Sequence, residues 1–164
     1  MVPANWEHPK VKNEYTGKMG YQPMYDQSFP EVFAEWLAEF DRIRAGNLTD
    51  DERGYWPRGL ADWLHDDGAP PDPAYYMPDW PDEERTHYMM YETTTEGTPK
   101  SPAFATPEEL ARWLAATKAS AFAGEAASYE AWLSVARGGY APSMVISDGR
   151  MLSGVEACAK LPTT

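Results

Sequence analysis

Six prolines between positions 57 and 81 limit what the middle of this chain can fold into. Proline lacks the amide donor that a helix needs and clashes with the preceding turn, so a continuous helix cannot run through these positions. The same region is strongly acidic, because residues 50–96 contain 13 acidic residues and three arginines. This stretch accounts for −10 of the chain's net charge of −12. The sequence therefore predicts an extended, acidic, proline-rich segment over residues 66–85.

The aromatic residues of this segment argue against disorder, since Tyr and Trp side chains bury large areas on a neighbouring surface. Its carboxylates lack the i, i+4 spacing to cations that stabilises a helix, and we expect most of them to face water. We predict that the segment contacts a basic partner, while its aromatic residues anchor it to the core or add apolar contacts. The candidate partner-binding residues are Asp66, Asp67, Asp72, Tyr75, Tyr76, Asp79, Trp80, Asp82, Glu83 and Glu84.

The length of 164 residues fits one folded domain over residues 1–164. Hydrophobic residues make up 43% of the chain, including 7 Trp and 10 Tyr, which is enough to build a core. No apolar run approaches the roughly 20 residues of a membrane span, and residues 1–12 lack the apolar stretch of a signal peptide. We expect a soluble protein of the cytoplasm without a membrane partner.

Two helices are predicted in the first half of the chain. Large apolar residues recur at three- and four-residue spacing over residues 30–45, and Pro30 is tolerated in the first helical turn. We expect this helix to be a core element with Trp36 and Phe40 buried. A shorter helix with one apolar side is predicted over residues 57–65.

The second half has clearer signals for where helices begin and end. Thr106, Pro107 and Glu109 form a capping-box pattern that opens a helix over residues 107–117. Ser128 is the predicted N-cap of a further helix, and two glycines at its far end stop it.

Strand signals are few, which favours an α+β fold with a small sheet. Residues 86–94 are rich in Tyr, Met and Thr, and residues 143–153 contain an Asp-Gly turn between two short apolar runs. We expect these two segments to form a small antiparallel sheet packed with about four helices. Residues 1–27 are expected to wrap over the core, and residues 86–154 to form a strand–helix–helix–hairpin unit.

Part of the chain resembles a group of phage proteins. Residues 88–122 read YMMYETTTEGTPKSPAFATPEELARWLAATKASAF, and residues 128–133 read SYEAWL. These segments resemble small uncharacterised acidic proteins of tailed bacteriophages and prophages. The resemblance implies a viral accessory protein that acts in the host-cell cytoplasm, and it brings no activity with it. Some similar proteins carry a CPxC-type metal site before this segment, but the acidic stretch stands there in this chain, so no zinc is implied.

The residues give little support to catalysis or to a cofactor. His8, His65 and His87 form no pair at the i, i+4 spacing of two ligands on one helix face. The triplet His65-Asp66-Asp67 could bind a divalent ion, although a helix end explains it more simply. Cys158 is the one cysteine, so it cannot form an internal disulfide, and no nucleophile elbow or phosphate-binding glycine loop occurs. We predict no catalytic residue, no metal site and no cofactor.

The acidity favours a binding protein. A net charge of −12 repels phosphate, which disfavours direct nucleic-acid binding, and an array of carboxylates can take the place of a phosphate backbone on a basic groove. We predict a non-enzymatic protein that binds a basic host protein or nucleoprotein complex and inhibits it, in host takeover or against a host defence. The alternatives are a structural or assembly protein of the virion or replication complex, a metal-dependent enzyme using His65 and His87, and acidity that serves solubility. Residues 92–101 are a second candidate recognition loop.

Overall fold

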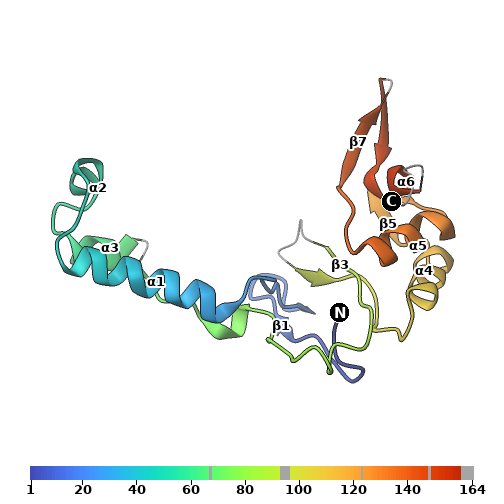
Figure 1. The fold of residues 1–164 in the computed structure, drawn as a ribbon, viewed down its shortest axis with the longest axis horizontal. Coiled ribbons are helices and arrows are strands. Elements are labelled where there is room, and N and C mark those ends of the chain that lie inside the picture. Colours follow the sequence, from blue (N-terminus) through green and yellow to red (C-terminus); the bar gives the residue numbers. More distant parts are fainter. Residues whose placement is uncertain (67, 93–96, 123, 148, 160–164) are drawn as a thin grey trace. The chain divides into compact units, whose positions relative to one another are not determined.

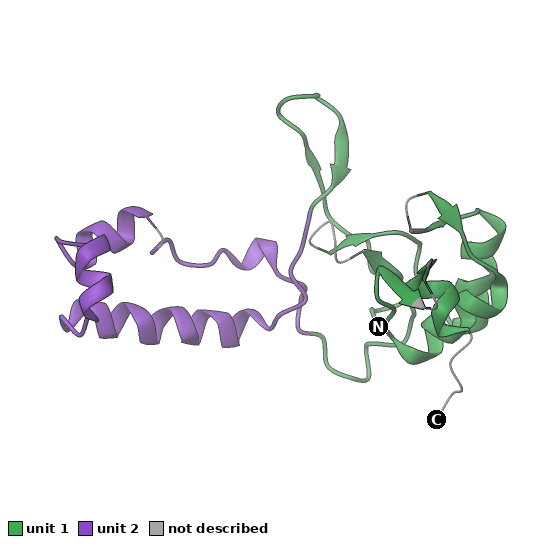
Figure 2. Ribbon diagram, turned by 90° about the horizontal axis from the view of Figure 1, so that it is seen from above, with its two compact units in different colours: residues 1–22, 80–164 green, residues 23–79 purple. Residues whose placement is uncertain are grey.

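The computed structural model describes residues 1–66, 68–92, 97–122, 124–147 and 149–159, which group into two compact units (Figure 2). Unit 1 consists of residues 1–22 and 80–164, and unit 2 consists of residues 23–79. Unit 2 is thus an insertion between two parts of unit 1. This division does not test whether the two units fold together, so the single domain expected over residues 1–164 stays a prediction.

Unit 2 is mostly helical (Figure 1). Its elements are α1 (Phe29–Arg44), α2 (Asp50–Tyr55), α3 (Leu60–Asp66) and the 3-10 helix η1 (Pro73–Tyr75). The helix expected over residues 30–45 is confirmed as α1, which has a proline in its first turn and two arginines in its last turn, where cations favour the helix dipole. The helix expected over residues 57–65 is confirmed as α3, but it begins later, since residues 57–59 form a turn.

A row of aromatic rings along α1 packs unit 2 together. Neighbouring rings have centroids 5.4 to 6.3 Å apart, within the range of favourable aromatic pairs. The rings belong to Tyr25, Phe29, Phe33, Trp36, Phe40, Trp63 and Tyr76. Trp63 is buried, but Trp36 and Phe40 are half-buried, so the expectation that both lie in the core is wrong. A unit of this size has too little chain to cover every aromatic residue of a long helix.

Unit 1 contains the remaining elements, which are short. They are β1 (Lys10–Lys12), β2 (Met19–Tyr21), β3 (Tyr91–Glu92), β4 (Thr98–Pro99), α4 (Pro107–Ala116), β5 (Ser120–Phe122), β6 (Glu125–Ala126), α5 (Tyr129–Gly138), β7 (Met144–Ser147), β8 (Arg150–Ser153) and α6 (Gly154–Cys158). The α+β class is confirmed. The strands form four separate two-stranded antiparallel sheets rather than one, and the described residues contain six α-helices rather than four.

The core of unit 1 lies between α4 and α5, and α6 contributes to it. Leu110 and Leu114 of α4 pack with Ala131 and Trp132 of α5 and with Val155 of α6, and all five are buried. This packing explains why the apolar residues of these helices recur at three- and four-residue spacing.

The predicted helix starts in unit 1 are confirmed by their hydrogen bonds. The Thr106 side chain accepts a hydrogen bond from the Glu109 amide at 3.2 Å, and the Ser128 side chain accepts one from the Ala131 amide at 3.2 Å. α5 ends at Gly139, whose φ of 78° is the left-handed conformation that glycine adopts without strain. The hairpin expected over residues 143–153 is confirmed as β7 and β8, with Asp148 of its turn outside the described residues.

The N-terminal segment is ordered but does not wrap the core throughout. Val2 is buried and forms a β-bridge with His87, whereas the β1–β2 hairpin is exposed on all six strand residues. The strand expected over residues 86–94 is shorter in the structure: bridges at His87 and Tyr88 precede the two-residue strand β3. Residues 93–94 lie outside the described part of the chain.

Candidate partner-binding surface

The structure divides the predicted partner-binding segment between the two units. Asp66, Asp72, Tyr75, Tyr76 and Asp79 belong to unit 2. Trp80, Asp82, Glu83 and Glu84 belong to unit 1. Asp67 lies outside the described residues. Each unit therefore carries its own part of the segment.

The expectation that the acidic side chains of this segment face water is confirmed for its described members, all of which are exposed. Asp72 also accepts a hydrogen bond from the Ala74 amide at 2.9 Å and so caps η1. Asp66 lies 2.8 Å from Nδ1 of His65, and Asp82 lies 3.8 Å from the Arg85 guanidinium. These local contacts leave the carboxylates accessible to a partner.

The aromatic residues of the segment divide by role. Tyr76 is half-buried against the rings of Tyr25 and Phe29, and Trp80 is half-buried with its ring edge-to-face on Trp6 at 4.7 Å. Both anchor the segment to its own unit. Tyr75 is 51% exposed and is the aromatic residue of this set most open to a partner.

The charge of the chain is concentrated in unit 2. Residues 23–79 contain 13 acidic residues and four arginines, a net charge of −9, whereas unit 1 contains 13 acidic and 10 basic residues. All four arginines of unit 2 already form ion pairs inside it: Arg42 with Glu39 and Glu52, Arg44 with Asp41, Arg53 with Asp50, and Arg58 with Asp62. Because the carboxylates outnumber the arginines three to one, pairing within unit 2 cannot neutralise it.

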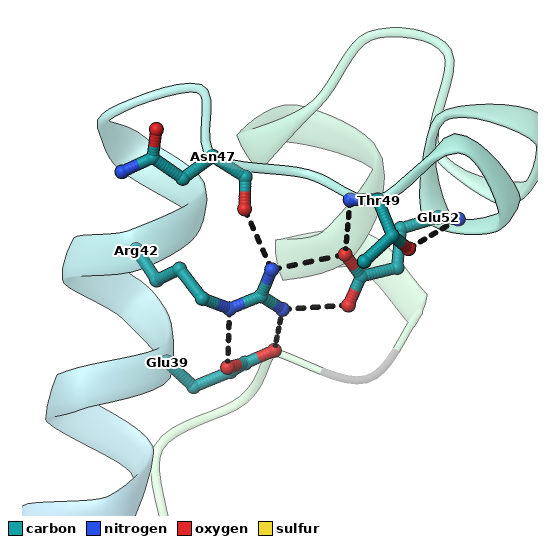
Figure 3. Close-up of polar contacts among 5 residues, drawn as sticks. All are labelled: Glu39, Arg42, Asn47, Thr49 and Glu52. Carbon is teal, nitrogen blue, oxygen red and sulfur yellow. Dashed lines mark hydrogen bonds and ion pairs between the residues drawn. The ribbon is translucent and has the colours of Figure 1, made fainter.

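Arg42 links α1 to α2 and is the centre of the polar network in unit 2 (Figure 3). Its guanidinium donates to the Glu39 carboxylate on α1 and to the Glu52 carboxylate on α2, the latter at 2.6 and 2.9 Å. It also donates to the backbone carbonyl of Asn47 at 2.6 Å. Bidentate arginine–carboxylate contacts fix geometry as well as adding energy. These contacts fix the position of α2 relative to α1.

Hydrogen bonds from Arg42 and from the Thr49 amide lower the pKa of Glu52 from 4.5 to about 2. A carboxylate with a lowered pKa in the folded state contributes stability that is present above its unfolded pKa and lost as the pH falls through the folded pKa. We expect Glu52→Gln to lower the thermal midpoint at pH 7, and the difference from the unchanged protein to shrink as the pH falls from about 4.5 to about 2. Thermal unfolding followed by circular dichroism across this range measures it.

Glu35→Gln is the matched control for that measurement, because Glu35 is an exposed carboxylate on α1. Its substitution is expected to leave the midpoint nearly unchanged at every pH. A Glu52→Gln difference that stays constant between pH 7 and pH 2 would contradict the role assigned to the Arg42–Glu52 pair.

The helix α2 was missed in reading the sequence, although its signal is present. Thr49 accepts a hydrogen bond from the Glu52 amide at 3.3 Å, and the Glu52 side chain accepts one from the Thr49 amide at 2.7 Å. This is a complete capping box, and the spacing Thr-Asp-Asp-Glu predicts it. α2 ends at Tyr55, before Pro57, the first proline of the acidic region.

Each of the three histidines has a structural partner. His8 is buried, with Nε2 2.6 Å from the Gln22 carbonyl, so this nitrogen carries the proton. Its Nδ1 is 3.3 Å from the Tyr91 hydroxyl, and that hydroxyl accepts a hydrogen bond from Trp6 Nε1 at 3.0 Å. His65 is exposed beside Asp66, and that carboxylate raises its pKa. In the described parts of the chain no group of three or more His, Cys, Asp or Glu residues could hold a metal ion.

Unit 1 has a shallow hollow of about 550 Å³ beside α4. Phe104, Trp113 and several alanines line it, with His87, Glu109 and Arg112 among its polar residues. Glu109 and Arg112 are exposed and His87 is half-buried, so the hollow offers no desolvated polar group for chemistry.

The candidate loop over residues 92–101 has ordered ends. Lys100 forms an ion pair with Glu92 at 2.6 Å, and the buried Ser101 hydroxyl accepts from the Met90 amide at 2.9 Å and donates to the Pro102 carbonyl at 2.8 Å. These contacts give the ends of the loop a folding role. Residues 93–96 lie outside the described part, so a recognition role for the loop stays a prediction.

Among the described residues no helix is long and apolar enough to cross a membrane. Comparison of the chain with protein-family models, with curated proteins and with solved structures gives no match.

Proposed function

We propose that this chain is a non-enzymatic accessory protein of a phage or prophage, which binds a basic surface of a host protein in the host cytoplasm and inhibits it. The observation that carries the proposal is the charge of unit 2, which is −9 over residues 23–79 with all four of its arginines already paired. A partner that brings unpaired lysines and arginines supplies the cations that unit 2 lacks.

Charge of this kind acts first on the rate of association. Like-signed carboxylates on one small unit add up to a field that attracts a basic surface and speeds encounter, and the effect weakens as salt screens it. Inhibition follows when the basic surface is one that otherwise binds a phosphate backbone, since the carboxylates then compete with nucleic acid for the same side chains.

The test compares two variants that each remove three exposed carboxylates. The first neutralises unit 2 by Asp26→Asn, Glu31→Gln and Glu35→Gln. The second neutralises the unit 1 part of the predicted segment by Asp82→Asn, Glu83→Gln and Glu84→Gln. Both have the same net charge, and exposed substitutions change stability by about 0.5 kcal/mol or less per site.

The partner is captured from a bacterial lysate, purified, and its association with each protein is measured at low and at moderate salt. We expect the unit 2 variant to associate more slowly, with a flatter salt dependence, and the unit 1 variant to change less. A competition assay with nucleic acid then measures inhibition. If both variants associate at the rate of the unchanged protein, the acidity serves solubility and the proposal fails.

An assembly role is the second candidate, and the β7–β8 hairpin favours it. Ile146 and Met151 are cross-strand partners in the register of this hairpin, and both are exposed. Met144, two positions before Ile146 on the same face of the hairpin, is exposed as well, and contiguous exposed apolar patches mark contact surfaces between proteins. Mass spectrometry of purified particles, searched for this chain, tests this role.

A further inference from the structure

The β1–β2 hairpin is a basic element in an acidic chain. Residues 10–21, which we call the basic hairpin, contain three lysines and one glutamate, whereas the whole chain has a net charge of −12. Every residue from 10 to 21 is exposed, so the basic hairpin adds no buried residue to the core of unit 1. Packing in that core therefore does not account for its side chains.

The three lysines of the basic hairpin form no ion pair with a described residue. Lys10 and Lys12 are two positions apart on β1, so they lie on the same side of the hairpin, as do their cross-strand partners Tyr21 and Met19. The Lys10 Nζ is 5.0 Å from the centroid of the Tyr21 ring, a cation–π contact. Lys18 directly precedes β2. The hairpin thus presents three cations that lack a carboxylate partner.

The loop at the end of the basic hairpin is ordered and presents a tyrosine. The Asn13 side chain accepts hydrogen bonds from the amides of Tyr15 and Thr16 at 3.0 and 2.8 Å. The Gly17 amide donates to the Asn13 carbonyl at 2.8 Å. Tyr15 is 98% exposed. Tyrosine is enriched among the residues that contribute most to protein interfaces, so an ordered, exposed Tyr15 suits a contact with a partner.

Unit 2 carries carboxylates that match these lysines. Asp26, Glu31 and Glu35 are exposed, and none of them forms an ion pair with a described residue. Glu31 and Glu35 lie one turn apart on α1, which is about 6 Å along the helix axis. Lys10 and Lys12 are about 7 Å apart along β1. The two spacings are close enough for each lysine to face one carboxylate.

We propose that the basic hairpin of one copy binds unit 2 of a second copy, with its lysines against Asp26, Glu31 and Glu35 and with Tyr15 in the same contact. Charge complementarity selects this occupant, since unit 2 has a net charge of −9 and its four arginines are already paired. Because each copy has one hairpin and one unit 2, a two-fold dimer contains the contact twice. This inference goes beyond the proposed function, which concerns a host protein.

The experiment measures self-association of the full chain by sedimentation velocity at physiological ionic strength, where charges more than about 8 Å apart are largely screened. We expect a dimer that forms as the protein concentration rises. Two charge-reversed proteins test the contact. The reversed hairpin carries Lys10→Glu, Lys12→Glu and Lys18→Glu, and the reversed unit 2 carries Asp26→Lys, Glu31→Lys and Glu35→Lys. Each alone is expected to dimerise at least about tenfold more weakly, because like charges then face each other.

Mixing the two reversed proteins restores opposite charges across the contact in both directions. We expect the mixture to form a 1:1 pair about as tightly as two unchanged copies do. The matched control is Asp82→Lys with Glu83→Lys and Glu84→Lys, which has the net charge of the reversed unit 2 but changes unit 1. This control is expected to dimerise like the unchanged protein. Circular dichroism of each variant checks that it has folded.

The role of Tyr15 is tested separately from the charges. Tyr15→Ser is expected to weaken dimerisation about tenfold, because it removes an aromatic contact at the interface. The matched control is Tyr140→Ser, since Tyr140 is 69% exposed and lies in unit 1 outside the basic hairpin. It is expected to leave dimerisation unchanged. Equal effects of the two substitutions would remove Tyr15 from the contact and contradict the proposal as stated.

The outcomes separate this inference from the proposed function. A protein that stays monomeric up to about 1 mM overturns the inference, as does a mixture of the reversed proteins that forms no pair. If the reversal at residues 82–84 weakens dimerisation as much as the reversed unit 2 does, net charge controls association and the inference fails. None of these results bears on the proposed function, which is tested by association with the host protein.

Discussion

Replacing Trp63 with alanine is expected to lower the free energy of unfolding by about 3 to 5 kcal/mol, through lost apolar contact and the cavity that remains. Trp63 is the most buried ring of the aromatic row in unit 2, with 4% of its surface exposed, and it contacts both Trp36 and Phe40. Its backbone carbonyl also accepts from the Gly68 amide at 2.6 Å, which ties the end of α3 to the same place. Denaturant unfolding followed by circular dichroism measures the loss.

Leu64→Ala is the control, because Leu64 is the next residue of α3 and is 42% exposed. It is expected to cost about 1 kcal/mol or less. Trp36→Ala should fall between the two, since Trp36 is half-buried and donates to the Gly68 carbonyl at 3.1 Å. If Trp63→Ala and Leu64→Ala lower the free energy of unfolding equally, Trp63 is not at the centre of the packed core of unit 2.

The second large effect is expected at the start of α6. Gly154 is buried, and a Cβ added there would overlap the carbonyl oxygen of Pro142. Neither the backbone of Pro142 nor that of Gly154 can rotate out of the way as a side chain can. Gly154→Ala is therefore expected to cost about 3 kcal/mol, at the upper end of the usual range for overpacking. Thermal unfolding measures it as a lowered midpoint.

Gly138→Ala is the matched control within the same unit. Gly138 lies in the last turn of α5, and nothing would lie within 4 Å of the added Cβ. Alanine forms helices better than glycine, so this variant is expected to be as stable as the unchanged protein or up to about 1 kcal/mol more stable. A Gly154→Ala protein with the midpoint of the Gly138→Ala protein would contradict the packing of α6 against residue 142.

Unit 2 combines high charge with a small core, and the Arg42 network shows how the two are compatible. Arg42 holds two carboxylates and a backbone carbonyl at the joint between α1 and α2, so part of the acidity of unit 2 stabilises its own fold. The carboxylates of Glu31 and Glu35 lie away from this joint and are exposed. Removing them therefore probes binding, whereas removing Glu52 probes stability.

Patterns confined to a few neighbouring residues were sufficient to predict α1, α4 and α5 with their ends, and α3 apart from its start, which lies three residues later than predicted, whereas α2 and α6 were not predicted. The apolar spacing of α1, the caps at Thr106 and Ser128, and the glycine that ends α5 all depend on contacts within about four positions. The Asp-Gly hairpin is of the same kind. The capping box of α2 is equally local, since Thr49 and Glu52 lie three positions apart.

Tertiary structure decided which of these elements share a core and which surface carries the charge. Trp36 and Trp63 have similar local surroundings of apolar residues, but contacts across unit 2 bury the second and leave the first half-buried. Likewise, the sequence shows an acidic stretch over residues 50–96, whereas the fold gathers residues 23–79 into one unit and assigns Asp82, Glu83 and Glu84 to the other. Burial and unit membership depend on contacts between residues far apart in the chain, and the spacing of neighbouring residues does not reveal these contacts.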